Sequence, residues 1–133
     1  MEAIDTPTVV LLVEDERILR AAIADELRSA GCEVIETGNA EDAIAHACAG
    51  GRVDVVFTDI QLPGPLNGWD VAEHFRGLDG DVTIIYASGN LVDRSRCVVR
   101  SLFFDKPYDA AAVVHACACR GETECKLSRE TGG

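Results

Sequence analysis

Acidic, hydroxyl and basic side chains stand at the ends of apolar runs in this 133-residue chain: Glu14 and Asp15 after VVLLV, Asp59 after VVFT, Ser88 after IIYA, and Lys106 after LFFD. An ionised aspartate at the end of a buried apolar strand costs free energy unless a nearby group or ion interacts with its charge. Three carboxylates held together repel one another and take up protons unless a cation shares their site. Mg²⁺ suits a site with one or two direct carboxylates and water as the remaining ligands. Lys106 adds a point charge on a flexible stem, which fits a carboxylate or a phosphoryl oxygen.

The elements that must position these residues follow from the hydrophobic pattern. Continuous β-branched and aliphatic runs are typical of strands covered on both faces. We expect strands at Thr8–Val13, Cys32–Thr37, Val53–Thr58, Val82–Ala87 and Leu102–Phe104. Amphipathic spacing and caps predict helices at Glu16–Ala30, from the cap Asn39 to Ala49, at Trp69–Arg76, after Asn90 (short and polar), and at Ala110–Cys119 behind the cap Asp109. Strand and helix alternate, so the sequence predicts an α/β fold with a five-stranded parallel sheet and helices on both faces.

Composition places the chain among folded proteins of one compact domain, with 47% apolar and 26% charged residues. We expect residues 1–7 to be a flexible N-terminus, 8–119 the domain, and 120–133 a disordered tail with few apolar anchors. The net charge of −11 argues against nucleic acid and anionic membranes as partners. With neither a membrane-length apolar stretch nor a signal peptide, the cytoplasm is the expected location. The six cysteines then read mostly as small buried residues in a reducing compartment.

Four segments, in this order along the chain, resemble the receiver domain of two-component response regulators: LLVEDE, VVFTDIQLPGPLNG, IIYASGN and FFDKPY. The resemblance covers about Val9 to Cys119 and is closest in style to stand-alone receivers whose last motif reads FFxKPY. It implies a flavodoxin-like, doubly wound (βα)5 fold and a phosphoprotein that signals through protein–protein interaction. Such a domain is a phosphoacceptor rather than a conventional enzyme, although it catalyses its own phosphorylation and slow dephosphorylation.

The resemblance assigns the acidic residues their roles. Asp59 is the phosphoacceptor, which receives a phosphoryl group from a sensor histidine kinase or a histidine phosphotransfer protein. Asp15 and Asp59 would ligate Mg²⁺ directly, together with the main-chain carbonyl of Gln61. Glu14 would act through a metal-bound water.

The remaining roles fall on residues around the phosphoryl group. Lys106 and Ser88 would contact its oxygens, and Phe103 stands where the family carries its switch aromatic. Gln61 and Asn90 flank the site and would tune dephosphorylation. Phe103 lacks the hydroxyl of a tyrosine, and a phenylalanine on a short strand is often simply core. The segment Asn90–Ser101 is also shorter and more charged than the usual fourth helix of the family.

The sequence also allows a comparison with other functions of this fold. A phosphorylation-independent interaction module would be favoured by loss of an acidic residue or the lysine, and none is lost. The chain could also be the receiver fragment of a larger hybrid kinase. A flavin- or nucleotide-binding protein of this fold would want a phosphate-binding loop where EDER stands. Zinc at His115, Cys117, Cys119 and Cys125 is disfavoured, because helical residues two apart point to different sides. We expect the phosphodonor to dock near Arg17, Ile18 and Ala21, with an unknown protein as the downstream target.

Overall fold

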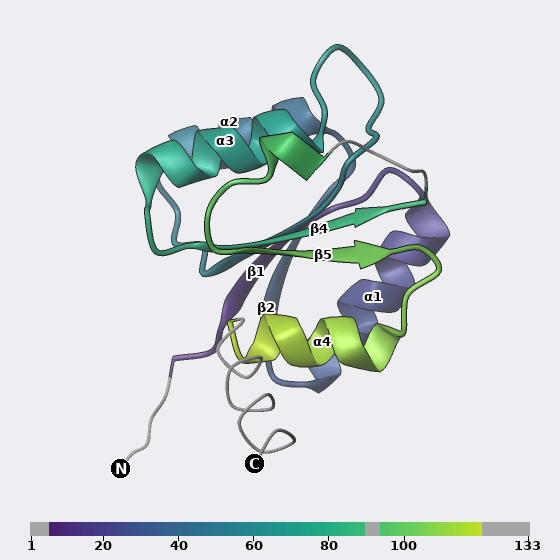
Figure 1. The fold of residues 1–133 in the computed structure, drawn as a ribbon. Helices are drawn as coiled ribbons and strands as arrows, with labels where there is room; N and C mark the ends of the chain where they lie inside the picture. Colours follow the sequence, from purple (N-terminus) through teal and green to yellow (C-terminus); the bar gives the residue numbers. More distant parts are fainter. Residues whose placement is uncertain (1–5, 90–93, 121–133) are drawn as a thin grey trace, which may run out of the picture.

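A computed structural model describes residues 6–89 and 94–120. Its five parallel strands lie in the order β2-β1-β3-β4-β5, as Figure 1 shows, and the predicted α/β sheet is confirmed. The strands are β1 (Val9–Val13), β2 (Glu33–Thr37), β3 (Val55–Asp59), β4 (Thr83–Ser88) and β5 (Ser101–Asp105). Strand order reverses between β1 and β3, which are neighbours, so the segments that follow these two strands diverge at the carboxyl edge. Ligands of doubly wound sheets bind at such a point.

Within residues 6–89 and 94–120, four α-helices cover the sheet: α1 (Arg17–Ser29), α2 (Ala40–Cys48), α3 (Gly68–Leu78) and α4 (Ala110–Ala118). Helices α1 and α4 pack on one face and α2 and α3 on the other, as the layers of Figure 1 show. Strands β1, β3 and β4 send alternate side chains into both cores, which is why these strands read as continuous apolar runs. Along the part of the chain that is described, no helix has the length and apolar character needed to span a membrane.

Helix starts agree with the capping chemistry of the sequence. Asn39 accepts a hydrogen bond from the backbone N–H of Asp42, and Asp109 accepts one from that of Ala111, as predicted. Helix α3 begins one residue earlier than predicted because Asn67 and Asp70 form a capping box, in which each side chain accepts from the other residue's backbone N–H.

The connection between β4 and β5 differs from the helical layers elsewhere. Asn90 and the three residues after it lie outside the described residues, and the described part, residues 94–100, contains a single 3₁₀ turn, η1 (Arg94–Arg96). Arginines fasten this segment to α3. Arg96 makes a bidentate ion pair with Glu73, at 2.9 and 3.0 Å, and a further contact with Asp70. A short polar helix is expected in this segment from the sequence. Its described part instead contains one 3₁₀ turn, which ion pairs hold against α3.

Candidate functional site

Glu14, Asp15 and Asp59 meet at the carboxyl edge of the sheet. Each offers a carboxylate oxygen, and these atoms lie within 4.8 Å of one another. Glu14 and Asp59 are buried, with 5% and 8% of their surface exposed, whereas Asp15 is open to solvent. The adjacency of β1 and β3 brings them together, because Glu14 and Asp15 follow β1 directly and Asp59 ends β3.

Lys106 bridges the two buried carboxylates. Its Nζ lies 3.0 Å from Oδ2 of Asp59 and 3.1 Å from Oε1 of Glu14. The backbone N–H of Lys106 donates to the carbonyl of Ser88 at 2.8 Å, which fixes the lysine beside the end of β4. Ser88 is the last residue of β4 and is itself buried. The structure thus brings together five of the residues named from sequence, from four separate segments of the chain.

The electrostatics of the site oppose full ionisation. Burial, and secondly the Glu14 carboxylate, raise the pKa of Asp59 from 3.8 to about 6, although Lys106 pulls it down. Burial would lower the pKa of Lys106, but the hydrogen bond and charge of Asp59, followed by those of Glu14, raise it overall. One ammonium ion therefore does not neutralise the cluster. A second cation is favoured, and a set of carboxylate oxygens is the chemistry that Mg²⁺ prefers.

Gly68 shapes this site and was missed in the sequence interpretation. Its N–H donates to the carbonyl of Ile60 at 2.8 Å, folding the loop after β3 back over the strand end. A Cβ at position 68 would collide with the carbonyl oxygen of Asp59 and lie 2.8 Å from Cα of Ile60. The available signal was the asparagine–glycine pair at the start of α3, where a helix cap meets a residue without a side chain.

The residues expected to tune dephosphorylation or transmit the signal have fewer described contacts with the acidic site. Gln61 is exposed two residues beyond Asp59, and Asn90 lies outside the described residues. Phe103 is half-buried in β5, with its ring centroid 6.1 Å from that of Tyr86. The Arg94 guanidinium lies 3.8 Å above the Phe103 ring. Phe103 is thus both a core contact and the base of a cation–π pair, and its switching role stays a prediction.

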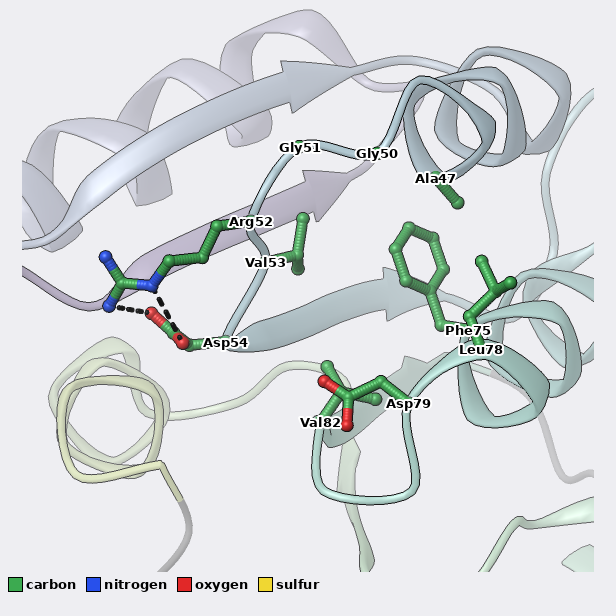
Figure 2. A pocket seen from close by; sticks show the side chains of 10 residues that line it. All are labelled: Ala47, Gly50, Gly51, Arg52, Val53, Asp54, Phe75, Leu78, Asp79 and Val82. Atoms are coloured by element: carbon green, nitrogen blue, oxygen red, sulfur yellow. Dashed lines mark hydrogen bonds and ion pairs between the residues drawn. The ribbon is translucent and has the colours of Figure 1, made fainter.

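Two hollows differ in their relation to the acidic cluster, since the first borders it at Asp15 and the second lies at the opposite edge of the sheet. One, of about 840 Å³, runs along the start of α1 beside Asp15, Arg17, Ile18 and Ala21. The other, of about 330 Å³, opens at the amino edge of the sheet between the ends of α2 and α3, where Phe75 and Val53 form apolar walls (Figure 2). At the side of this hollow Asp54 pairs with Arg52, as the dashed lines in Figure 2 mark, so these two charged groups serve the fold.

The cysteines follow the sequence interpretation only in part. Cys32 and Cys117 are buried, as expected, and burial raises the pKa of both thiols. Cys97 and Cys119 are half-buried, and Cys48 is exposed because it occupies the outer side at the end of α2. The expected majority of buried cysteines is therefore not found among the described residues. Among the described residues, the single group of three or more potential metal ligands is the Glu14, Asp15 and Asp59 cluster, so His115, Cys117 and Cys119 form none.

A doubly wound parallel sheet with acidic residues after β1 and β3 and a lysine after β5 defines a class of phosphate-handling α/β domains. Comparison with known families gives the particular assignment: residues 10–117 match the model of the response regulator receiver domain. The chain belongs to this family and takes the receiver role in two-component signalling.

Solved structures agree with this assignment. A response regulator receiver protein from Sinorhizobium medicae WSM419 is 31% identical, with a TM-score of 0.81 over 85% of this chain and 93% of that one. The receiver domain of the hybrid histidine kinase CckA is 27% identical, with a TM-score of 0.72 over 86% of this chain and 99% of that one.

Curated relatives are longer proteins. The sensor kinase/phosphatase LuxN of Vibrio campbellii is 27% identical over 83% of this chain but only 13% of its own length. The sensory transduction protein RegX3 of Mycolicibacterium smegmatis is 32% identical over 80% of this chain and 47% of its own length. The chain thus spans well under two thirds of these relatives.

Proposed function

We propose that Asp59 is the phosphoacceptor of this receiver and that Glu14, Asp15 and Lys106 complete its reaction site. The observation that carries the proposal is the Lys106 Nζ held at 3.0 Å from Asp59 and 3.1 Å from Glu14, beside three carboxylates that share one site. Asp15 and Asp59 would hold Mg²⁺ directly, with the Gln61 carbonyl, while Glu14 acts through water. Bound Mg²⁺ would supply charge neutralisation for the transferred phosphoryl group.

In the transfer, an Asp59 carboxylate oxygen attacks the phosphorus atom of the donor. An O–P bond to Asp59 forms as the P–N bond of a phosphohistidine breaks, and the departing imidazole takes up a proton. Lys106 then moves from carboxylate oxygen to phosphoryl oxygen, and the Ser88 hydroxyl donates to another. These groups are held by strand ends, so the site is positioned before the donor arrives, which is how phosphoryl transfer is mainly accelerated.

The phosphodonor would be a histidine kinase or a phosphotransfer protein that docks on the start of α1. The side chain of Ile18 is 83% exposed there, beside Arg17 and Ala21 along the hollow that leads to Asp15. The hollow beside the reaction site, with the exposed Ile18 at its wall, gives a docking protein both a recess and an apolar contact. The downstream target, reached in the cytoplasm through the phosphorylated form, is a further protein.

Intact mass spectrometry after incubation with Mg²⁺ and acetyl phosphate tests the phosphoacceptor. We expect a phosphoryl adduct in the wild type that is absent from Asp59→Asn and suppressed by EDTA. Asp79→Asn is the matched control, because Asp79 is an exposed aspartate at the opposite edge of the sheet. An adduct that persists in Asp59→Asn would refute the assignment. A folded wild type that binds Mg²⁺ but forms no adduct would favour the phosphorylation-independent interaction module instead.

The receiver domain could also be part of a longer hybrid kinase, with the same site chemistry. Receivers of hybrid kinases are among the relatives, so the same domain could serve inside a longer kinase. The site chemistry would be unchanged, and the phosphodonor would then be a histidine of the same protein.

A further inference from the structure

Among the described residues, a cysteine and a histidine outside the acidic site lie in contact with each other. Cys48 Sγ and His74 Nε2 are 3.8 Å apart, although they are 26 residues apart in the sequence. Cys48 ends α2, and His74 lies in α3, which packs beside α2 on the same face of the sheet (Figure 1). Both side chains are exposed. Because α2 and α3 pack against each other, their backbones keep the two exposed side chains within reach of one another.

We propose that Cys48 and His74 form a surface binding site for a zinc-like d¹⁰ cation. Zinc bonds of about 2.3 Å to sulfur and about 2.05 Å to nitrogen, at a tetrahedral angle, place the two donors about 3.6 Å apart. The observed separation therefore needs an adjustment of only about 0.2 Å, well within a side-chain rotation. A thiolate and an imidazole are ligands that such ions prefer over oxygen.

The surroundings also suit a cation. Cys48 is the last residue of α2, and the partial negative charge at a helix C-terminus favours a positive ion there. Exposure lets a hydrated ion reach both donors, and water would complete its coordination. Of the described cysteines, Cys48 is the only exposed one, whereas Cys32 and Cys117 are buried. The thiol must lose its proton to solvent as the ion binds, and His74 must present an unprotonated Nε2.

This site is separate from the carboxylate cluster in chemistry as well as in place. Glu14, Asp15 and Asp59 offer only oxygen atoms, which favour Mg²⁺. Cys48 and His74 offer one sulfur and one nitrogen atom, which favour zinc. Excess Mg²⁺ should therefore saturate the first site without displacing zinc from the second, and the inference does not depend on Asp59 being phosphorylated.

Cobalt(II) absorbance provides the test, because a thiolate–cobalt charge-transfer band reports a sulfur ligand directly. The full chain is titrated with Co²⁺ in excess Mg²⁺ under reducing conditions, and Zn²⁺ is then added. We expect a charge-transfer band that zinc abolishes, that is missing in Cys48→Ser, and that is weakened in His74→Gln. Cys97→Ser and His46→Gln are matched controls, which keep the band because neither residue joins the pair.

Thermal unfolding gives an independent readout. Zinc that binds the folded chain should raise the melting temperature of the wild type and of the two controls, but not that of Cys48→Ser. The two substituted side chains are exposed, so both variants should fold normally. A wild type without a charge-transfer band, or a band that survives in Cys48→Ser, would overturn the proposal.

Discussion

At the scale of single residues, Asp59 combines burial with a carboxylate neighbour. Its pKa of about 6 in the fold, against 3.8 ordinarily, means that the folded chain binds more protons than the unfolded chain between these values. Stability without metal should therefore fall as pH rises from about 4 to about 6, by about 3 kcal/mol in the limit of full ionisation. Holding the Asp59 carboxylate in a buried position that suits a cation therefore lowers the free energy of unfolding when no cation is bound.

Asp59→Asn should reveal this cost. The variant cannot ionise at position 59, so at pH 7 in EDTA we expect it to be about 1–3 kcal/mol more stable than the wild type, with the gap closing as pH falls toward 4. Urea unfolding across this range measures the difference. A gap that is independent of pH would show that Asp59 titrates normally. Mg²⁺ should narrow the gap at pH 7, because it stabilises only the chain with the Asp59 carboxylate.

At the scale of elements, Gly68 sets how closely α3 approaches the end of β3. In Gly68→Ala the added methyl group meets backbone atoms of Asp59 and Ile60, which cannot rotate away. We expect a loss of about 2–4 kcal/mol of unfolding free energy and slower phosphorylation, because the strand end must shift.

Gly77→Ala is the matched control for this substitution. Gly77 lies in the same helix, and beyond that helix's own backbone no atom of the described residues lies within 4 Å of the position its Cβ would take. Alanine there should stabilise the chain by about 0.5–1 kcal/mol. Equal effects of the two substitutions, measured by chemical denaturation, would contradict the close-approach explanation.

Arg76 joins α3 to the segment before β5. Its guanidinium donates to the carbonyls of Val82 and Val99, at 2.6 and 2.7 Å, and to three neighbouring carbonyls, those of Asp79, Gly80 and Arg100. Lysine has one donor group and cannot span both segments. Arg76→Lys should cost about 1–3 kcal/mol and speed amide exchange at Val99 and Ser101. Arg28→Lys, at a half-exposed ion pair with Glu36, should change stability by less than about 0.5 kcal/mol.

These elements also show what could be predicted from the sequence. Strands β1, β3 and β4 were predictable because burial on both faces leaves continuous apolar runs. The polar residues at or just after the strand ends then indicated the site. The segment between β4 and β5 was not predictable, because its form depends on two contacts with α3 that join residues 23 positions apart. Arg76 of α3 donates to the carbonyl of Val99, and Arg96 pairs with Glu73 of α3. The same holds for Gly68, whose importance comes from a backbone approach, and for Cys48 with His74, which only helix packing brings together.

At the scale of the whole molecule, the two edges of the sheet have separate tasks. The carboxyl edge holds the acidic site. At the amino edge, Asp54 contacts residues near both ends of the described chain. Its carboxylate accepts from the Val9 N–H at 2.8 Å and pairs with Arg52 at 2.7 Å and Arg120 at 3.4 Å. Strand β3 separates Asp54 from Asp59 by five residues, about 16 Å of extended chain.

This separation predicts that stability and phosphorylation can be altered independently. Asp54→Asn leaves two arginines without their shared anion, and we expect a loss of about 2 kcal/mol of unfolding free energy. The rate of Mg²⁺-dependent phosphorylation by acetyl phosphate, measured well below the melting temperature, should stay at the wild-type value. The described partners of the Asp54 carboxylate are Val9, Arg52 and Arg120, none of which is at the carboxyl edge. A folded Asp54→Asn chain that phosphorylates slowly would mean that β3 transmits strain from one edge to the other. The sheet would then be a coupled unit rather than a rigid support for the site.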